Sequence, residues 1–192
     1  MKTSLEQSMA IQVWITEGMD RASESIREIH AFDTDLCIDQ TRCHPLSELS
    51  ETNSGPEDVD WKACVLRPFS GEFRGAAALS MDPDEALAWA VADGSKQDIV
   101  GTFLEVGGEV LGGIIDAAQA LAGSSLSMGC SRFREDSLTG CLLSTHAPSD
   151  TVAIRSLVKV RAGGRDLEGQ LHLLMEPKSM SRLLRALSVS LH

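Results

Sequence analysis

The sequence predicts an α/β (α+β) fold, with a largely antiparallel central sheet and two long helices side by side on one of its faces. Apolar residues recur at helical spacing over residues 5–29 and again over residues 98–121. The segments that follow each of these stretches alternate in polarity, which is typical of strands. The 192 residues are 43% hydrophobic and 23% charged, the mixture of an ordinary globular protein.

The same succession of elements occurs twice along the chain. Two pairs of short segments match: residues 81–83 (Met-Asp-Pro) with 175–177 (Met-Glu-Pro), and residues 17–20 (Glu-Gly-Met-Asp) with 105–108 (Glu-Val-Gly-Gly). An acidic residue followed by proline is a typical helix start, so each half ends on a second helix. We therefore predict one domain built by duplication of an α-β-β-β-α unit, with pseudo-repeats at about residues 5–93 and 96–188.

The remaining elements follow from turn residues and alternation. We expect strands at residues 33–39, 61–68, 72–81, 125–133 and 140–145, a loop at 47–60, a hairpin of 152–161 with 167–175, and helices opening at Asp82-Pro83 and Glu176-Pro177.

Helical periodicity also predicts which side chains are buried. Met9 and Val100 fall on the apolar stripes of the two long helices, whereas Gly108 and Gly112 fall away from them. The tryptophans at positions 14, 61 and 89 are expected in the core. Each glycine inside a helix costs up to about 1 kcal/mol relative to alanine, so the glycines of the second long helix predict close packing of the two helices or close approach of a partner.

The charge excludes some classes of protein. A formal net charge of −11 argues against nucleic-acid binding and against anionic membrane surfaces. No apolar stretch is long enough to span a bilayer and no secretory signal is evident, so we expect a cytoplasmic protein. Five cysteines without a CxxC motif indicate reduced thiols. Cys37, Cys43 and His44 fit buried thiols better than a metal site, and no metal is expected.

Two segments of the long helices carry a further pattern. They are residues 15–22 (Ile-Thr-Glu-Gly-Met-Asp-Arg-Ala) and residues 103–113 (Phe-Leu-Glu-Val-Gly-Gly-Glu-Val-Leu-Gly-Gly). A long helix bearing Glu-x-Gly-Asn, followed by strands and a second helix, resembles the CheC/CheX/FliY group of chemotaxis phosphatases. Residues three apart on a helix share one face, so two such side chains can enter a partner's active site together.

The resemblance implies a set of site residues. In that group the glutamate pairs with a lysine of a phosphorylated response regulator, and the asparagine amide orients the water that attacks the aspartyl phosphate. Glu17 and Glu105 match the glutamate, while Asp20 and Gly108 stand at the asparagine position. These four residues are the candidate catalytic set. Gly108 offers no side chain, so the second site needs a substitute such as Glu109.

Two hypotheses for function follow from the resemblance. In the first, the protein docks on a phosphorylated CheY-like response regulator and promotes hydrolysis of its aspartyl phosphate; the Mg²⁺ belongs to the regulator, and the protein has no cofactor of its own. In the second, it is a non-catalytic interaction module, like the middle domain of the flagellar switch protein, that has lost the water-positioning asparagine. Other chemotaxis or flagellar switch proteins are then further partners. A homodimer and an ordinary solvated role for the acidic helix residues both stay open.

Overall fold

The computed structural model describes residues 4–30, 33–51, 61–92, 98–123, 125–148 and 150–190. All pairings of its seven-stranded sheet are antiparallel, which confirms the predicted fold class. The strands are β1 (Thr34–Pro45), β2 (Trp61–Ser70), β3 (Gly75–Met81), β4 (Ser127–Met128), β5 (Arg132–Ser137), β6 (Val152–Ala162) and β7 (Arg165–Met175). The helices are α1 (Leu5–His30), α2 (Leu46–Glu51), α3 (Pro83–Ala90), α4 (Ile99–Ala122), α5 (Leu138–Leu143) and α6 (Pro177–Ser190).

The order of the strands interleaves the two halves of the chain. The sheet runs β1-β6-β7-β3-β2, and both β4 and β5 pair with β2. The sheet has the same neighbours when β1, β2 and β3 are exchanged with β5, β6 and β7. The pairing of β1 with β6 then corresponds to that of β5 with β2, and β7 pairs with β3 in the middle. A duplicated unit would give such an order, although the duplication itself stays a prediction.

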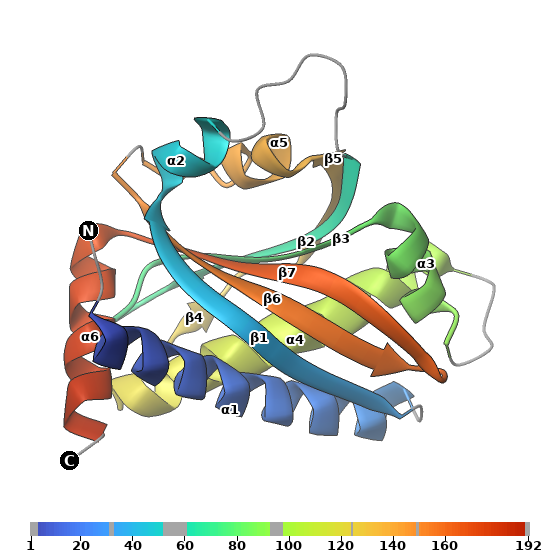
Figure 1. Cartoon of the computed structure of the whole chain (residues 1–192), viewed down its shortest axis with the longest axis horizontal. Helices are drawn as coiled ribbons and strands as arrows, with labels where there is room; N and C mark the ends of the chain where they lie inside the picture. The colour runs from blue at the N-terminus through green and yellow to red at the C-terminus, as the bar shows by residue number, and fades with distance from the viewer. Residues whose placement is uncertain are drawn as a thin grey trace.

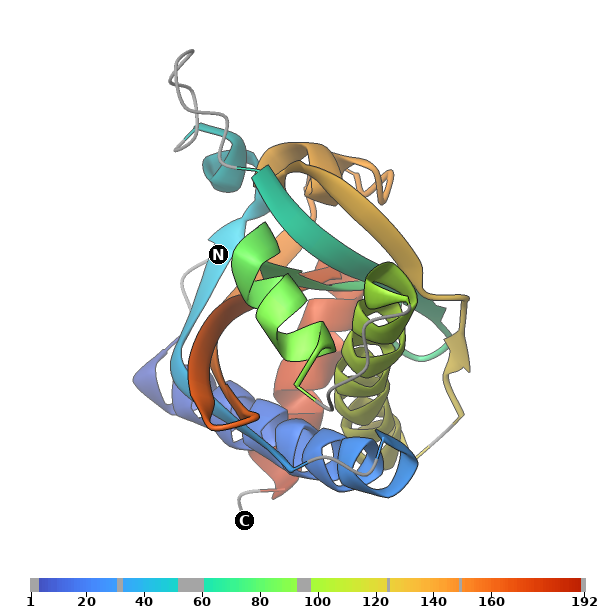
Figure 2. The same cartoon turned by 90° about the vertical axis from the view of Figure 1, so that its right-hand side faces the viewer.

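The two long helices cover one face of the sheet, with α6 and α3 at its ends (Figures 1 and 2). They touch at glycines. A Cβ added at Gly18 would lie 2.7 Å from Ile114 Cδ1, and one added at Gly113 would lie 2.4 Å from the Gly18 carbonyl oxygen. No side chain fits between backbones this close, so helix packing explains these two glycines. Of the glycines of the second long helix, Gly113 thus confirms the predicted packing of the two helices.

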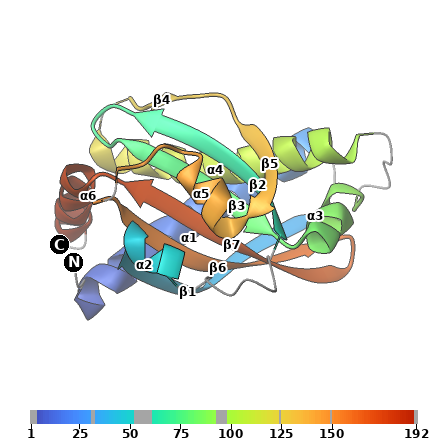
Figure 3. The same cartoon turned by 90° about the horizontal axis from the view of Figure 1, so that it is seen from above.

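The other face of the sheet carries the two short helices, α2 and α5 (Figure 3). A smaller apolar cluster lies beneath them: Leu46, Leu66, Ala78, Leu138, Leu142, Ala153 and Leu174. The strand predicted at residues 140–145 is wrong, because α5 occupies this stretch. Ser137 caps that helix, since its hydroxyl accepts a hydrogen bond from the Gly140 amide at 3.1 Å.

Other boundaries shift as well. The expected strand at residues 125–133 divides into β4 and β5, and β1 continues well beyond residue 39. The helix α2 begins where a loop was expected from residue 47, and residues 52–60 of that loop lie outside the described residues. The hairpin of β6 and β7, and the helices after both acid-proline pairs, form as predicted.

Burial differs from the helical-wheel expectation at a few positions. Met9 is 58% exposed and Val100 is 48% exposed, although both were placed on apolar stripes. Trp61 is 53% exposed at the start of β2, whereas the other two tryptophans are buried as expected. Gly108 and Gly112 are buried rather than turned away from the core. Within the described segments, no helix is both long and apolar enough to cross a membrane.

Candidate functional site

The first candidate pair lies on the open face of α1. Glu17 and Asp20 are both exposed, one turn apart on the helix. They line a shallow groove of about 580 Å³ together with Met9, Gln12, Val13 and Thr16. Exposed apolar side chains therefore stand next to two carboxylates on a single helix face.

Glu17 is held loosely. Its Oε1 accepts a hydrogen bond from Arg21 Nη2 at 2.6 Å, one turn further along α1. Both side chains are well exposed, and such pairs contribute only about 0.3–0.5 kcal/mol. A lysine of a partner can therefore replace Arg21 at little cost. Asp20 makes no ion pair or hydrogen bond with any residue that the structure describes.

The second candidate pair, on α4, is divided by burial. Glu105 is exposed, but Gly108 is buried. A Cβ at Gly108 would lie 3.2 Å from Ser131 Oγ, because the chain between β4 and β5 covers this part of α4. Arg67 fastens that cover: its Nη1 donates to the Gly108 carbonyl at 3.1 Å and its Nε donates to the Gly129 carbonyl at 3.2 Å. A side chain at position 108 would point into this cover and not toward a partner.

Glu109 does not replace the missing side chain. Its Oε2 accepts a hydrogen bond from Ser25 Oγ at 2.6 Å, in the partly buried contact between α4 and α1. The carboxylate thus serves to fix the two helices together. Of the two helix pairs, only Glu17 with Asp20 presents both members on the surface.

The sequence predicted buried thiols at Cys37 and Cys43, but Cys37 is exposed and Cys43 is only half-buried. Cys64 on β2 and Cys141 on α5 are buried thiols that lie next to each other. This contact and burial raise the pKa of Cys64 far above its usual range. Among the residues described, no group of three or more histidines, cysteines and carboxylates is arranged to hold a metal.

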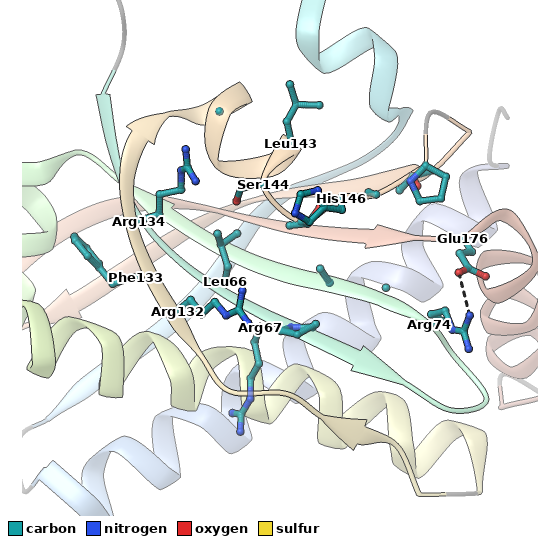
Figure 4. Close-up of a pocket in the computed structure, with 18 residues that line it drawn as sticks. Leu66, Arg67, Arg74, Arg132, Phe133, Arg134, Leu143, Ser144, His146 and Glu176 are labelled. Carbon is teal, nitrogen blue, oxygen red and sulfur yellow. Dashed lines mark ion pairs between the residues drawn. The ribbon is translucent and has the colours of Figure 1, made fainter.

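Sequence reasoning missed a cavity of about 810 Å³ on the face opposite α1 (Figure 4). Arg132 and Arg134 of β5, Arg74 after β2, and residues of the segment after α5 line it. Alternation along β5 hinted that both of its arginines share one face. Nothing in the sequence indicated that this face would meet the segment after α5, since the sequence predicts a strand over residues 140–145, where α5 ends.

The known proteins that resemble this chain are similar to it in structure and not in sequence. No protein-family model matches the sequence, and no curated protein matches it. FliY from Thermotoga maritima superposes with a TM-score of 0.73 at 10% identity, over 98% of this chain and 98% of that one. The FliM middle domain from H. pylori gives 0.65 at 10% identity, over 96% of this chain and 99% of that one. The chain has the fold of FliY and the FliM middle domain.

A third solved structure extends this likeness. CheX, in a complex with CheY, BeF3 and Mg²⁺ from Borrelia burgdorferi, gives a TM-score of 0.51 at 14% identity, over 85% of this chain and 98% of that one. The resemblance to the CheC/CheX/FliY group is therefore confirmed at the level of the fold. At these identities the fold does not decide between a phosphatase and an interaction module.

Proposed function

We propose that this protein binds a CheY-like response regulator through the α1 face formed by Met9, Val13, Glu17 and Asp20. The observation that carries the proposal is the exposed pair Glu17 and Asp20 beside exposed apolar side chains. Support comes from the fold, which the chain shares with a CheX that is found in complex with CheY.

The chemistry of this face suits such a partner. Val13 is 62% exposed and Met9 is 58% exposed, which is apolar surface that a partner can bury. Methionine adapts its shape to different surfaces, which favours it at a contact. Glu17 supplies the charge: when it leaves Arg21 for a lysine of the regulator, one exposed ion pair is exchanged for a better shielded one.

Hydrolysis is a second candidate function, and it is favoured by Asp20. Its free carboxylate can accept a hydrogen bond from the attacking water, as an amide would. Unlike an amide, it donates none and brings negative charge toward the phosphoryl group, which opposes the transfer. We therefore expect α1 alone to act, and to act slowly. The Mg²⁺ of the reaction would be held by the regulator, and no cofactor is proposed for this chain.

A switch-type interaction module is the alternative, in which α1 binds and no chemistry follows. It is favoured by the higher TM-score for the FliM middle domain, 0.65, than for CheX, 0.51. FliM of H. pylori is found in a complex with FliG, so components of this kind are further candidate partners. Either function would place the protein in the cytoplasm.

The test measures binding and phosphate release separately. CheY-type regulators of the same organism are titrated with the full chain in their phosphorylated and beryllofluoride forms, and phosphate release is followed with and without the chain. Glu17→Ala should weaken binding about tenfold, as expected for a charge-assisted contact. Glu28→Ala is the matched control, because it removes the same exposed carboxylate from the same helix about 16 Å away.

Equal loss in the two variants would mean that the contact reflects overall charge and not Glu17. Unchanged binding in Glu17→Ala combined with Asp20→Ala would end the proposal. Binding without faster phosphate release would select the interaction module.

A further inference from the structure

We propose that the cavity on the α5 side of the sheet binds a phosphorylated small molecule of nucleotide size. We name it the arginine cavity, because Arg74, Arg132 and Arg134 line it. It lies on the opposite face of the sheet from α1, so this inference stands apart from the proposed function (Figures 1 and 4).

The walls of the cavity come from segments that the fold brings together. Strands β2 and β5 pair so that Leu66 is opposite Arg132 and Cys64 is opposite Arg134. Partners in an antiparallel pair point to the same face, so both arginines rise from the face that carries α5. Arg74 stands at the far end of the cavity, and His146 lies above the strands between them (Figure 4).

The positive charge of this cavity is only partly neutralised. Arg74 Nη1 is 3.8 Å from Glu176 Oε1, and Arg134 Nη2 is 2.6 Å from Asp136 Oδ2. The guanidinium of Arg67 does not add to this charge, because it donates to the Gly108 carbonyl of α4 on the other face of the sheet. Arg132 is exposed and forms no ion pair or hydrogen bond with a residue in the described part of the chain. One positive charge thus remains in this hollow, in a chain whose net charge is −11.

This contrast favours an anion at this place. A strongly negative molecule repels anions from most of its surface, so an uncompensated basic hollow is where an anion binds favourably. Guanidinium groups match the oxygens of phosphate with paired donors, better than lysine does. Arg132 is open to make such a contact, and Arg74 needs only to give up a long, exposed ion pair.

The remaining lining suits an organic group attached to the phosphate. Leu66 and Ala76 form the floor, and Leu143, Ala147 and Pro148 stand on the α5 side. A volume of about 810 Å³ falls in the usual range for small-molecule sites, and exceeds what inorganic phosphate fills. Enclosure between the sheet and the segment after α5 fits a compact ligand better than an extended acidic peptide.

The backbone at the rim supports a built site. His146 has φ of 55°, and it is the one non-glycine residue with positive φ that the described segments contain. Residues with a side chain adopt the left-handed region uncommonly, and histidine is among those that do so more often. This position turns the chain back over the strands after α5. An imidazole at the rim adds a further donor to an anion.

Calorimetric titration of the full chain tests the proposal, with ATP, AMP, adenosine and inorganic phosphate as probes and no added metal. We expect ATP and AMP to bind and adenosine to bind at least tenfold more weakly. Arg132→Gln should weaken ATP binding about tenfold or more, as loss of a charged hydrogen bond does. Arg165→Gln is the matched control, since Arg165 is an exposed arginine at the start of β7, outside the cavity.

A second variant keeps the test independent of the arginines. Leu143 is 58% exposed at the cavity, so Leu143→Glu should leave the fold intact and abolish ATP binding by adding negative charge. The proposal is overturned if neither nucleotide binds at millimolar concentration, or if Arg132→Gln and Arg165→Gln weaken binding equally. Inorganic phosphate binding as tightly as ATP would overturn the assignment of an organic ligand. Binding of an oligoglutamate peptide in preference to ATP would identify the hollow as a protein contact instead.

Discussion

The two long helices of this protein carry matching glutamates, yet only one of them keeps its site open. On α1, Glu17 and Asp20 are exposed beside an apolar groove. On α4, Glu105 is exposed, but Gly108 lies beneath Ser131 and is tied to Arg67 through its carbonyl. The difference arises outside the helices, because the chain that crosses to β5 folds over one of them. A repeated motif therefore does not imply a repeated site.

The largest effect should come from the contact that joins the two helices. Gly113→Ala would place a Cβ 2.4 Å from the Gly18 carbonyl oxygen, where the backbone has no freedom to yield. We expect the free energy of unfolding to fall by about 3 kcal/mol in urea denaturation.

Gly108→Ala is the matched control on the same helix. Its Cβ would meet Ser131 Oγ at 3.2 Å, a side chain that can move. Better helix propensity should then keep the free energy of unfolding within about 1 kcal/mol of the parent. Equal losses in the two variants would contradict the difference in packing.

The second largest effect should come from a position at which the two halves of the sheet carry different residues. Ala78 of β3 is opposite His172 of β7, so equivalent strands carry different residues at one register position. His172 is fully buried, and neither ring nitrogen has a hydrogen-bond partner among the residues that the structure describes. Burial, assisted by the charge of Arg155, lowers the pKa of His172 to about 3. The unfolded chain binds a proton near pH 6.5 and the folded chain does not, so stability is lost as pH falls from about 6.5 toward 3.

Between pH 7.5 and 5.0 this linkage should remove about 2 kcal/mol from the free energy of unfolding. His172→Ala makes the position match Ala78. Between pH 7.5 and 5.0, the free energy of unfolding of the variant should therefore fall by about 2 kcal/mol less than that of the parent. This difference does not depend on the overall stability of the variant. Parallel pH profiles for parent and variant would show that His172 does not stay neutral in the fold.

A third effect addresses the chemistry at the two sites, and it rests on the proposed function. Asp20→Asn places an amide in the open groove of α1, so phosphate release from the regulator should quicken about tenfold. Gly108→Asn places the same amide beneath Ser131, where no regulator can reach it.

We therefore expect no gain from Gly108→Asn in the same phosphate-release assay. A gain there would mean that the chain between β4 and β5 moves aside and that the two sites are alike. No gain from either asparagine would favour the interaction module.

The smallest effect concerns the pair that holds Glu17. Arg21→Ala removes an exposed ion pair, so the free energy of unfolding should fall by only about 0.3–0.5 kcal/mol. Because Glu17 is then free, regulator binding should tighten by about twofold. Weaker regulator binding in titration would indicate that Arg21 itself contacts the partner.

The parts of the fold that the sequence predicts well are those whose pattern is local. The long helices have many turns of periodicity, and the turn at Gly163 and Gly164 has positive φ at both residues, as glycine allows. The pattern predicts a strand where the short helix α5 forms, because six residues hold little helical periodicity. The signal in the sequence that could have indicated a helix is Ser137, whose hydroxyl caps α5 by accepting a hydrogen bond from the Gly140 amide.

The site was predictable only in part, for a related reason. Exposure of Glu17 and Glu105 follows from the helical wheel, but burial of Gly108 depends on Ser131, a residue from the far side of β4. The arginine cavity needs the register of β2 with β5 and the helical state of α5, neither of which a single sequence specifies. Tertiary contacts of this kind override local pattern.

The pairing of β1 bears on how the chain reaches its fold during synthesis. Its register joins Thr34 to Ala162 and Pro45 to Val152, separations of 128 and 107 residues. During synthesis, β1 leaves the ribosome long before β6, the strand with which it pairs. Such distant pairing slows folding and leaves an unpaired strand exposed meanwhile. A cut between the halves would therefore yield fragments with an unfinished sheet, and not two small proteins.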